Sequence, residues 1–308
     1  MDIKTFRDQT AIERNLRSNA TNINLVAFRA DEEQLYVNDL RADESALDTV
    51  YNMLGISRRY ARKLPLRLMM PHIEYQARNV DKIVHMVSLN DALVGFSGAQ
   101  RFNPLYHSTI LDAAEDVIGP EANAEDILYS LNSSSFIVTN GVCTEPKVGD
   151  ITKAGILVKN SILGLQNPEF SLVAKRLVCT NGMVRTETIT RIGVYDRSMV
   201  PDTIERLWSQ AQNFVDEFGE TYSVPVQNNP AVLASFLAHH RVGGRIIGKI
   251  LEAVENAKPA TLYDLINVIT YIGTHETRGR WLQQVLQGLG AQLAHEYRTC
   301  DECHNILV

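Results

Sequence analysis

The sequence predicts an α+β fold in which a mixed, mainly antiparallel sheet core is followed by a helical C-terminal half. Residues 141 to 198 contain runs of four to eight apolar, β-branched-rich residues bounded by Gly, Asn and Pro, which is typical of strands. After residue 198 the apolar residues recur at helical spacing instead. We therefore expect four segments: an N-terminal arm with a first strand (1–42), an α+β core (43–198), a helical region (199–297) and a tail (298–308).

Two helices are predicted between residues 43 and 67. Apolar residues recur there at i, i+3, i+4 and i+7, at Leu47, Val50, Tyr51 and Leu54. Gly55 suits the C-terminal cap of the first helix. Ser57 suits the start of a second, short helix that ends before Pro65.

Turn residues and hydrophobic period predict the other elements of the first half. We expect a short helix or loose arm over residues 1 to 22, an early strand and a turn over residues 23 to 40, strands over residues 83 to 89 and 92 to 96, a helix over residues 106 to 119, a further turn of helix over residues 124 to 132, and a strand over residues 136 to 139.

The central stretch is expected to form a hairpin or meander. Two apolar runs flank residues 164 to 168, and the second run, residues 170 to 179, is the densest strand signal in the chain. Asn181-Gly182 follows it and is the strongest turn signal, because both residues tolerate positive φ. The helices predicted after it cover residues 201 to 218, residues 230 to 256 with an interruption near Gly243-Gly244, residues 261 to 273 with Thr261 as a cap, and residues 277 to 297.

Composition limits the classes of function. The net charge of −6 argues against a nucleic-acid-binding surface over the whole molecule, but leaves room for a local basic groove. The sequence has no apolar run of the roughly 18 residues that a membrane helix needs, so no membrane partner is expected. The N-terminus lacks an apolar signal region, which predicts a cytoplasmic protein.

Two basic clusters are candidates for contacts with phosphates. Arg58, Arg59, Arg62 and Lys63 lie in the predicted helix pair with no acid among them. In the dense strand, Lys175 and Arg176 could form a basic stripe across a sheet with Lys159, Arg185 and Arg191, of the kind that binds single-stranded nucleic acid. The nucleic-acid hypothesis expects both clusters to gather on one accessible face. The alternatives are a solvated basic helix face for the first cluster and cross-strand ion pairs with acids such as Glu169 or Glu187 for the second.

The tail carries the one candidate metal site. Cys300 and Cys303 are separated by two residues, a spacing that suits one side of a tetrahedral zinc site. Cys143, Cys179, a histidine or a second subunit would have to complete that site, and a reduced surface pair is the alternative. Nucleophile elbow, HExxH and kinase signatures are absent from the sequence, so we expect no enzyme.

The run Arg176-Leu-Val-Cys-Thr-Asn-Gly-Met183 resembles the signature of a phage and plasmid protein family, catalogued as domain of unknown function 932. Further pieces occur in the family's order: residues 54 to 64 upstream, residues 149 to 165 within the core, and residues 261 to 270 downstream. The resemblance covers roughly residues 45 to 295 and leaves out the cysteine tail. It implies a mobile-element origin and an accessory role in DNA metabolism, and it brings no catalytic residue.

Together the residues and the resemblance lead to two expectations. The first is a non-enzymatic phage or plasmid accessory protein that binds nucleic acid, with single-stranded DNA binding or annealing as its activity. A strand-rich core followed by helices is loosely similar to the single-strand-annealing recombinases of phages, an analogy at the level of fold alone. The alternative is a virion-associated or assembly protein that forms homo-oligomers, since an apolar sheet and a long helical half suit self-association as well.

Overall fold

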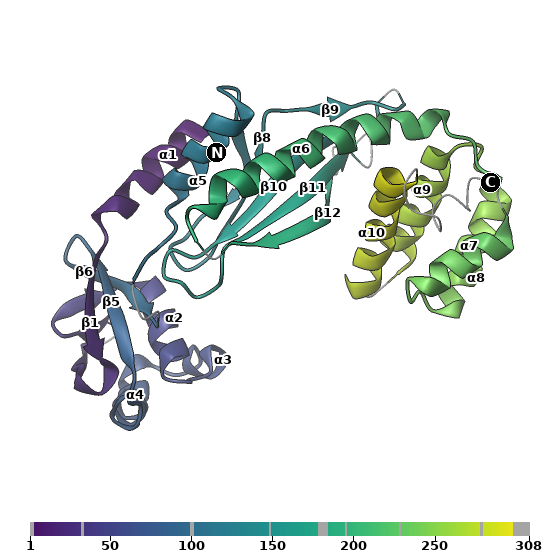
Figure 1. The fold of residues 1–308 in the computed structure, drawn as a ribbon. Coiled ribbons are helices and arrows are strands. Elements are labelled where there is room, and N and C mark those ends of the chain that lie inside the picture. Colours follow the sequence, from purple (N-terminus) through teal and green to yellow (C-terminus); the bar gives the residue numbers. More distant parts are fainter. Residues whose placement is uncertain are drawn as a thin grey trace.

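The α+β prediction is confirmed by a computed structural model. It describes residues 3–31, 34–98, 102–147, 149–177, 184–194, 196–227, 229–277 and 280–297. The strands form two mainly antiparallel sheets, and helices make up the C-terminal half (Figure 1). Within these ranges no helix combines the length and the apolar character needed to cross a bilayer.

The first sheet, sheet A, comes from the N-terminal third of the chain. Its order is β1-β5-β6-β4-β3-β2, and β4 pairs with β6 in parallel while the other described pairings are antiparallel. Its strands are β1 (Arg17–Asn22), β2 (Phe28–Asp31), β3 (Gln34–Val37), β4 (Leu40–Ala42), β5 (Ile83–Leu89) and β6 (Ala92–Ser97).

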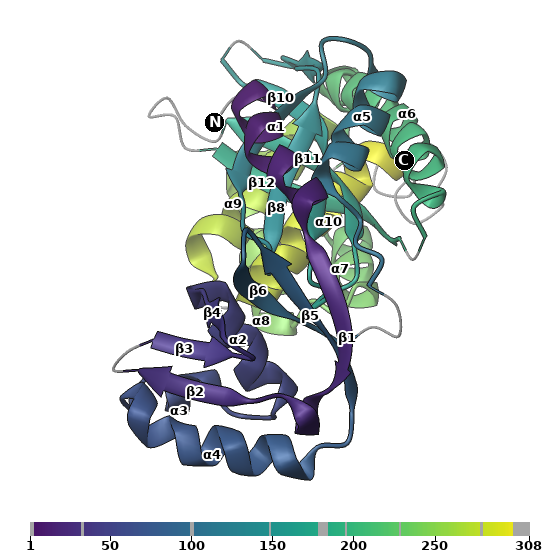
Figure 2. The same cartoon turned by 90° about the vertical axis from the view of Figure 1, so that its left-hand side faces the viewer.

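Three helices pack with sheet A around one apolar cluster. They are α2 (Glu44–Met53), α3 (Arg58–Ala61) and α4 (Leu66–Asn79), and Figure 2 shows α4 lying along the sheet. Helix α2 begins at Asp43, whose carboxylate accepts the N–H of Ala46 at 2.8 Å, as an N-cap should. It ends before Gly55, whose φ of +67° gives the expected left-handed cap.

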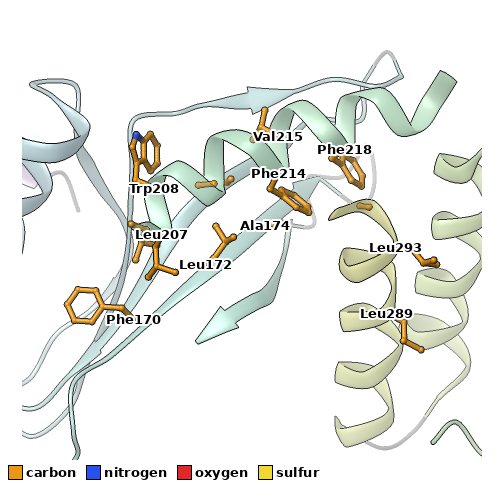
Figure 3. Packing of buried hydrophobic residues seen from close by; sticks show 14 of the residues in the cluster. Phe170, Leu172, Ala174, Leu207, Trp208, Phe214, Val215, Phe218, Leu289 and Leu293 are labelled. Carbon is orange, nitrogen blue, oxygen red and sulfur yellow. The ribbon is translucent and has the colours of Figure 1, made fainter. Parts of the chain in front are cut away.

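The second sheet, sheet B, is antiparallel in all its described pairings and has the order β12-β11-β10-β8-β7, with β9 beside β10. Figure 3 shows α6 lying along it, with Leu207 of the helix beside Leu172 of β11. The elements are α1 (Ile3–Ala11), α5 (His107–Ile118), β7 (Asn123–Leu128), β8 (Ser134–Thr139), β9 (Cys143–Thr144), β10 (Thr152–Asn160), β11 (Glu169–Leu177), β12 (Val184–Gly193) and α6 (Met199–Glu220).

Strand periodicity explains why sheet B buries one face so completely. Successive side chains of a strand point to opposite faces, so Ala154, Ile156 and Val158 of β10 project to the same side. All three are at most 2 % exposed, and they join the apolar cluster that α5 and α6 complete. The opposite face carries the charged partners described below.

The remaining helices follow α6 as predicted. Thr261 caps α9, because its hydroxyl accepts the N–H of Asp264 at 3.2 Å. The interruption near Gly243-Gly244 is confirmed, since it separates α7 from α8. These helices are α7 (Pro230–His239), α8 (Gly244–Ala257), α9 (Leu262–Tyr271) and α10 (Arg280–Glu296); the short helical turns are η1 (Ile12–Asn15), η2 (Ile23–Leu25), η3 (Thr221–Ser223) and the π-helical η4 (Ile272–Glu276).

Several local expectations were wrong. Residues 124 to 128, within the stretch 124 to 132 expected as a turn of helix, instead belong to strand β7, whose adjacent acids Glu125 and Asp126 interrupt the apolar alternation. The expected start of a strand at Ile23 is the helical turn η2. The second short helix does end before Pro65, as expected, since α3 ends at Ala61. The next helix, α4, was not predicted; it contains Pro71, and its buried row of Met69, Ile73 and Ala77 outweighs the local cost of that proline.

The two sheets divide the chain differently from the four expected segments. Residues 17–42 and the β5–β6 hairpin share sheet A, so the expected boundary at residue 42 falls inside one sheet. The β10–β11 hairpin is confirmed. The predicted Asn181-Gly182 turn lies outside the described residues, between the antiparallel strands β11 and β12.

Candidate nucleic-acid interface

Helices α3 and α4 lie beside sheet A (Figure 2), and they carry a cluster of exposed basic residues. Residues 58 to 80 contain six Lys or Arg and a single acid, in a chain whose net charge is −6. The exposed cations of this stretch define what we call the α3–α4 surface: Arg58, Arg59, Arg62, Lys63, Arg67 and Arg78.

One carboxylate serves two of these guanidinium groups. Asp48 of α2 lies 3.6 Å from Nη1 of Arg58 and 3.2 Å from Nη2 of Arg62. Arg78 is paired with Glu74 at 3.5 Å on the same helix. Within the described ranges, Arg59, Lys63 and Arg67 have no carboxylate partner. The surface therefore keeps a net positive charge after its ion pairs are counted, and four of the six predicted contact residues lie together on it.

Helical geometry explains why α4 exposes so many of its residues. Side chains three and four positions apart share a face, so Arg67, Glu74 and Arg78 form one row and Leu68, His72 and Tyr75 form the next. The opposite row packs on sheet A and is buried. Leu68 is 58 % and Tyr75 is 65 % exposed, and Tyr60 of α3 is 56 % exposed.

Lys175 does not belong to this surface, which corrects the expectation of a shared basic stripe. It lies near the C-terminal end of β11 in sheet B, whereas α3 and α4 pack with sheet A. Its ammonium lies 3.0 Å from carboxylate oxygens of both Glu125 and Asp126. Burial opposes its charge, but the hydrogen bonds and charges of Asp126 and Glu125 raise the pKa of Lys175 overall.

The ion-pair alternative thus describes this part of sheet B better than a basic stripe does. Lys159 and Arg191 both lie 3.3 Å from the carboxylate of Glu169, one of the two partners considered from the sequence. Arg176 is opposite Arg185 in the β11–β12 register, and the structure describes only the backbone of both residues.

A buried polar network under α5 was not foreseen from the sequence. Oε1 of Glu13 lies 2.6 Å from Nδ1 of His107, and Oε2 accepts the backbone N–H of His107 at 2.9 Å. Nε2 of His107 contacts the hydroxyl of Ser134, which also lies 3.1 Å from the backbone oxygen of Asn160. Because Tyr106, the N-cap residue of α5, makes no side-chain cap, Glu13 acts as the cap from a separate segment.

The order Ser134, His107, Glu13 matches the connectivity of a nucleophile, a base and an orienting acid. Burial rules out that role in this conformation. Glu13 and His107 are 0 % exposed and Ser134 is 1 % exposed, so no substrate reaches the hydroxyl. The rings of Phe6, Tyr129 and Phe136 pack around the imidazole. We interpret the network as a structural connection between the N-terminal segment and sheet B, and its separation in sequence is why no spacing signal revealed it.

The predicted zinc site cannot be placed. Cys300 and Cys303 lie outside the described residues, as does Cys179, whereas Cys143 is an exposed free cysteine. Among the side chains that the structure does describe, no three of His, Cys, Asp and Glu gather as metal ligands would.

Comparisons of the chain with protein-family models, with curated proteins and with solved structures found no match. The resemblance to the phage and plasmid family therefore stays a prediction. The α3–α4 surface is where positive charge and solvent exposure coincide.

Proposed function

We propose that the chain binds nucleic acid through the α3–α4 surface, as a non-enzymatic accessory protein. The carrying observation is the excess of exposed cations there: Arg59, Lys63 and Arg67 lack a carboxylate partner in the described ranges, and Arg58 and Arg62 share one. Unpaired guanidinium and ammonium groups on one surface attract phosphates and release their counterions. The phage or plasmid setting is a further part of the proposal and is supported by the sequence resemblance alone. A role in annealing is supported only by the analogy at the level of fold.

The local charge balance favours this site over sheet B, where the second basic cluster lies. Elsewhere the described basic residues of sheet B pair with carboxylates, as at Lys159, Lys175 and Arg191. A polyanion approaching those residues would also meet the paired acids. At the α3–α4 surface it meets more cations than acids, so a net acidic protein can still present one face that attracts phosphate.

Fluorescence anisotropy with a labelled 30-nucleotide DNA strand at about 50 mM salt tests the proposal, because phosphate contacts are strongest at low salt. The triple variant Arg59→Gln, Lys63→Gln, Arg67→Gln should lose most of the binding. The matched control is Lys4→Gln, Lys147→Gln, Arg206→Gln, which removes the same charge from exposed positions elsewhere in the chain.

The control separates a local site from net charge. Equal loss in both triple variants would reduce the effect to overall charge and would contradict the proposed site. Absence of binding by the unmodified protein would reject nucleic-acid binding altogether. In that case a large homo-oligomer in size-exclusion chromatography with light scattering would favour the assembly alternative.

A further inference from the structure

Tyr60 and Tyr75, which lie among the cations of the α3–α4 surface, differ from the other strongly exposed tyrosines of the structure in their aromatic neighbours. Tyr222 lies edge-on to Tyr263 with 5.8 Å between ring centroids, and Tyr271 lies 4.5 Å from the ring of His275. Tyr60 and Tyr75 have no such ring neighbour in the described ranges, although they are 56 % and 65 % exposed. Their rings are therefore open to a planar ligand.

Each of these tyrosines has cationic side chains within one helical turn. Arg59 precedes Tyr60 directly and Lys63 follows it by three positions, in a turn closed by the bond from the Lys63 N–H to the Tyr60 carbonyl at 3.0 Å. On α4, Arg78 lies three positions after Tyr75, where side chains are neighbours on a helix. A phosphate held by these cations would bring the attached base close to an aromatic face.

The structure of nucleic acids decides which form can use this arrangement. In a duplex the faces of the bases are stacked on one another inside the helix, so only phosphates and base edges meet a protein. In a single strand the faces are available, and exposed aromatic side chains bind them with little dependence on sequence. Cations alone would attract both forms.

We infer that the α3–α4 surface selects single-stranded nucleic acid over duplex, with Tyr60 and Tyr75 stacking on unpaired bases while Arg59 and Lys63 contact the adjoining phosphates. The inference rests on the proposed function and adds to it the class of substrate and two residues that contact it. The exposed side chain of Leu68, in the same row of α4 as Tyr75, adds an apolar contact for a base.

The test compares a labelled 30-nucleotide strand with its duplex at one salt concentration. The unmodified protein should bind the strand more tightly, and Tyr60→Leu with Tyr75→Leu should weaken strand binding about 25-fold or more, from a factor of about 5 or more per stacked base. Duplex binding should change less than twofold. Leucine keeps high helix propensity, so the variant is expected to fold.

Two further variants isolate stacking. Tyr60→Phe with Tyr75→Phe keeps both rings and should retain strand affinity, and Tyr222→Leu with Tyr271→Leu removes exposed tyrosines elsewhere and should leave it unchanged. Equal affinity of the unmodified protein for strand and duplex, or unchanged strand binding in the leucine pair, overturns the inference while phosphate binding stands. Loss of affinity in the Tyr60→Phe, Tyr75→Phe variant also overturns the inference, because strand binding would then depend on the tyrosine hydroxyl groups and not on ring stacking. Absence of binding to either form instead rejects the proposed function.

Discussion

Replacing Glu13 by alanine should destabilise the part of the protein built on sheet B. The carboxylate accepts from the ring Nδ1 of His107 at 2.6 Å and from its backbone N–H at 2.9 Å, and all of these groups are buried. The substitution leaves two buried donors without a partner and opens a gap beneath α5. Breaking a buried pair in this way costs about 3–5 kcal/mol.

The loss of unfolding free energy should be measurable by tryptophan fluorescence, which reports on one part of the molecule. Both tryptophans lie outside sheet A, Trp208 in α6 and Trp281 in α10, so their fluorescence follows sheet B and the helical region. Urea unfolding by this probe should show the loss at constant m-value. Far-UV circular dichroism reports both sheets, and the two transitions coincide only if they unfold together.

A matched control and a second variant define the magnitude. Glu115→Ala removes an exposed partner of Arg7 near the start of the chain, and an exposed pair contributes at most about 1 kcal/mol. Ser134→Ala should cost about 1–3 kcal/mol, since His107 and Asn160 each lose a contact with its hydroxyl. If Glu13→Ala costs no more than Glu115→Ala, the buried network does not hold the N-terminal segment in place and our interpretation of it is wrong.

Three further predictions concern packing, pH and charge. Gly95→Ala should cost about 1–3 kcal/mol in thermal unfolding, because the added Cβ would overlap the side chain of Leu163. In the double variant with Leu163→Ala the shorter side chain should remove part of that overlap, so the double variant should lose less stability than the sum of the two single variants. An additive loss would contradict this explanation. Burial, and then the charge of Glu13, raise the pKa of Tyr129, so the folded state holds the phenol proton more tightly than the unfolded state does. The free energy of unfolding should therefore fall as pH rises above the ordinary tyrosine pKa of about 10. Tyr129→Phe should show a smaller fall in alkaline urea titrations, and an equal fall would refute this assignment. Lys175→Met should cost about 1 kcal/mol and leave oligonucleotide affinity unchanged, whereas weaker binding would return Lys175 to the nucleic-acid site.

Hydrophobic period predicted most elements of the fold because it is a local property. The β5–β6 and β10–β11 hairpins and the long helix α6 have strong patterns and were placed within a few residues. Strand β7 was missed, since an edge strand with two adjacent acids has little apolar alternation. The division of the strands into two sheets depends on pairing between distant segments, such as β1 with β5, which no local pattern encodes.

The candidate site was predictable only in part, because contacts between distant segments are not encoded in a local sequence pattern. Arg58, Arg59, Arg62 and Lys63 are close in sequence, so one helical segment was enough to bring them together. The partners of Lys175 are Glu125 and Asp126, about 50 positions away, and became visible only through strand pairing. Tyr60 and Tyr75 had no sequence signal beyond their neighbouring cations, because their exposure depends on which faces of α3 and α4 pack with sheet A.

The salt dependence of single-strand binding tests the central claim most directly. If Arg58, Arg59, Arg62, Lys63 and Arg67 each contact a phosphate, the logarithm of the affinity should fall against the logarithm of salt concentration with a slope of about −3.5, which is about 100-fold between 50 and 200 mM. The triple variant Arg59→Gln, Lys63→Gln, Arg67→Gln should lower the magnitude of that slope by about 2, and the control triple should not. An unchanged slope in the α3–α4 variant would show that phosphates bind elsewhere and would contradict the account.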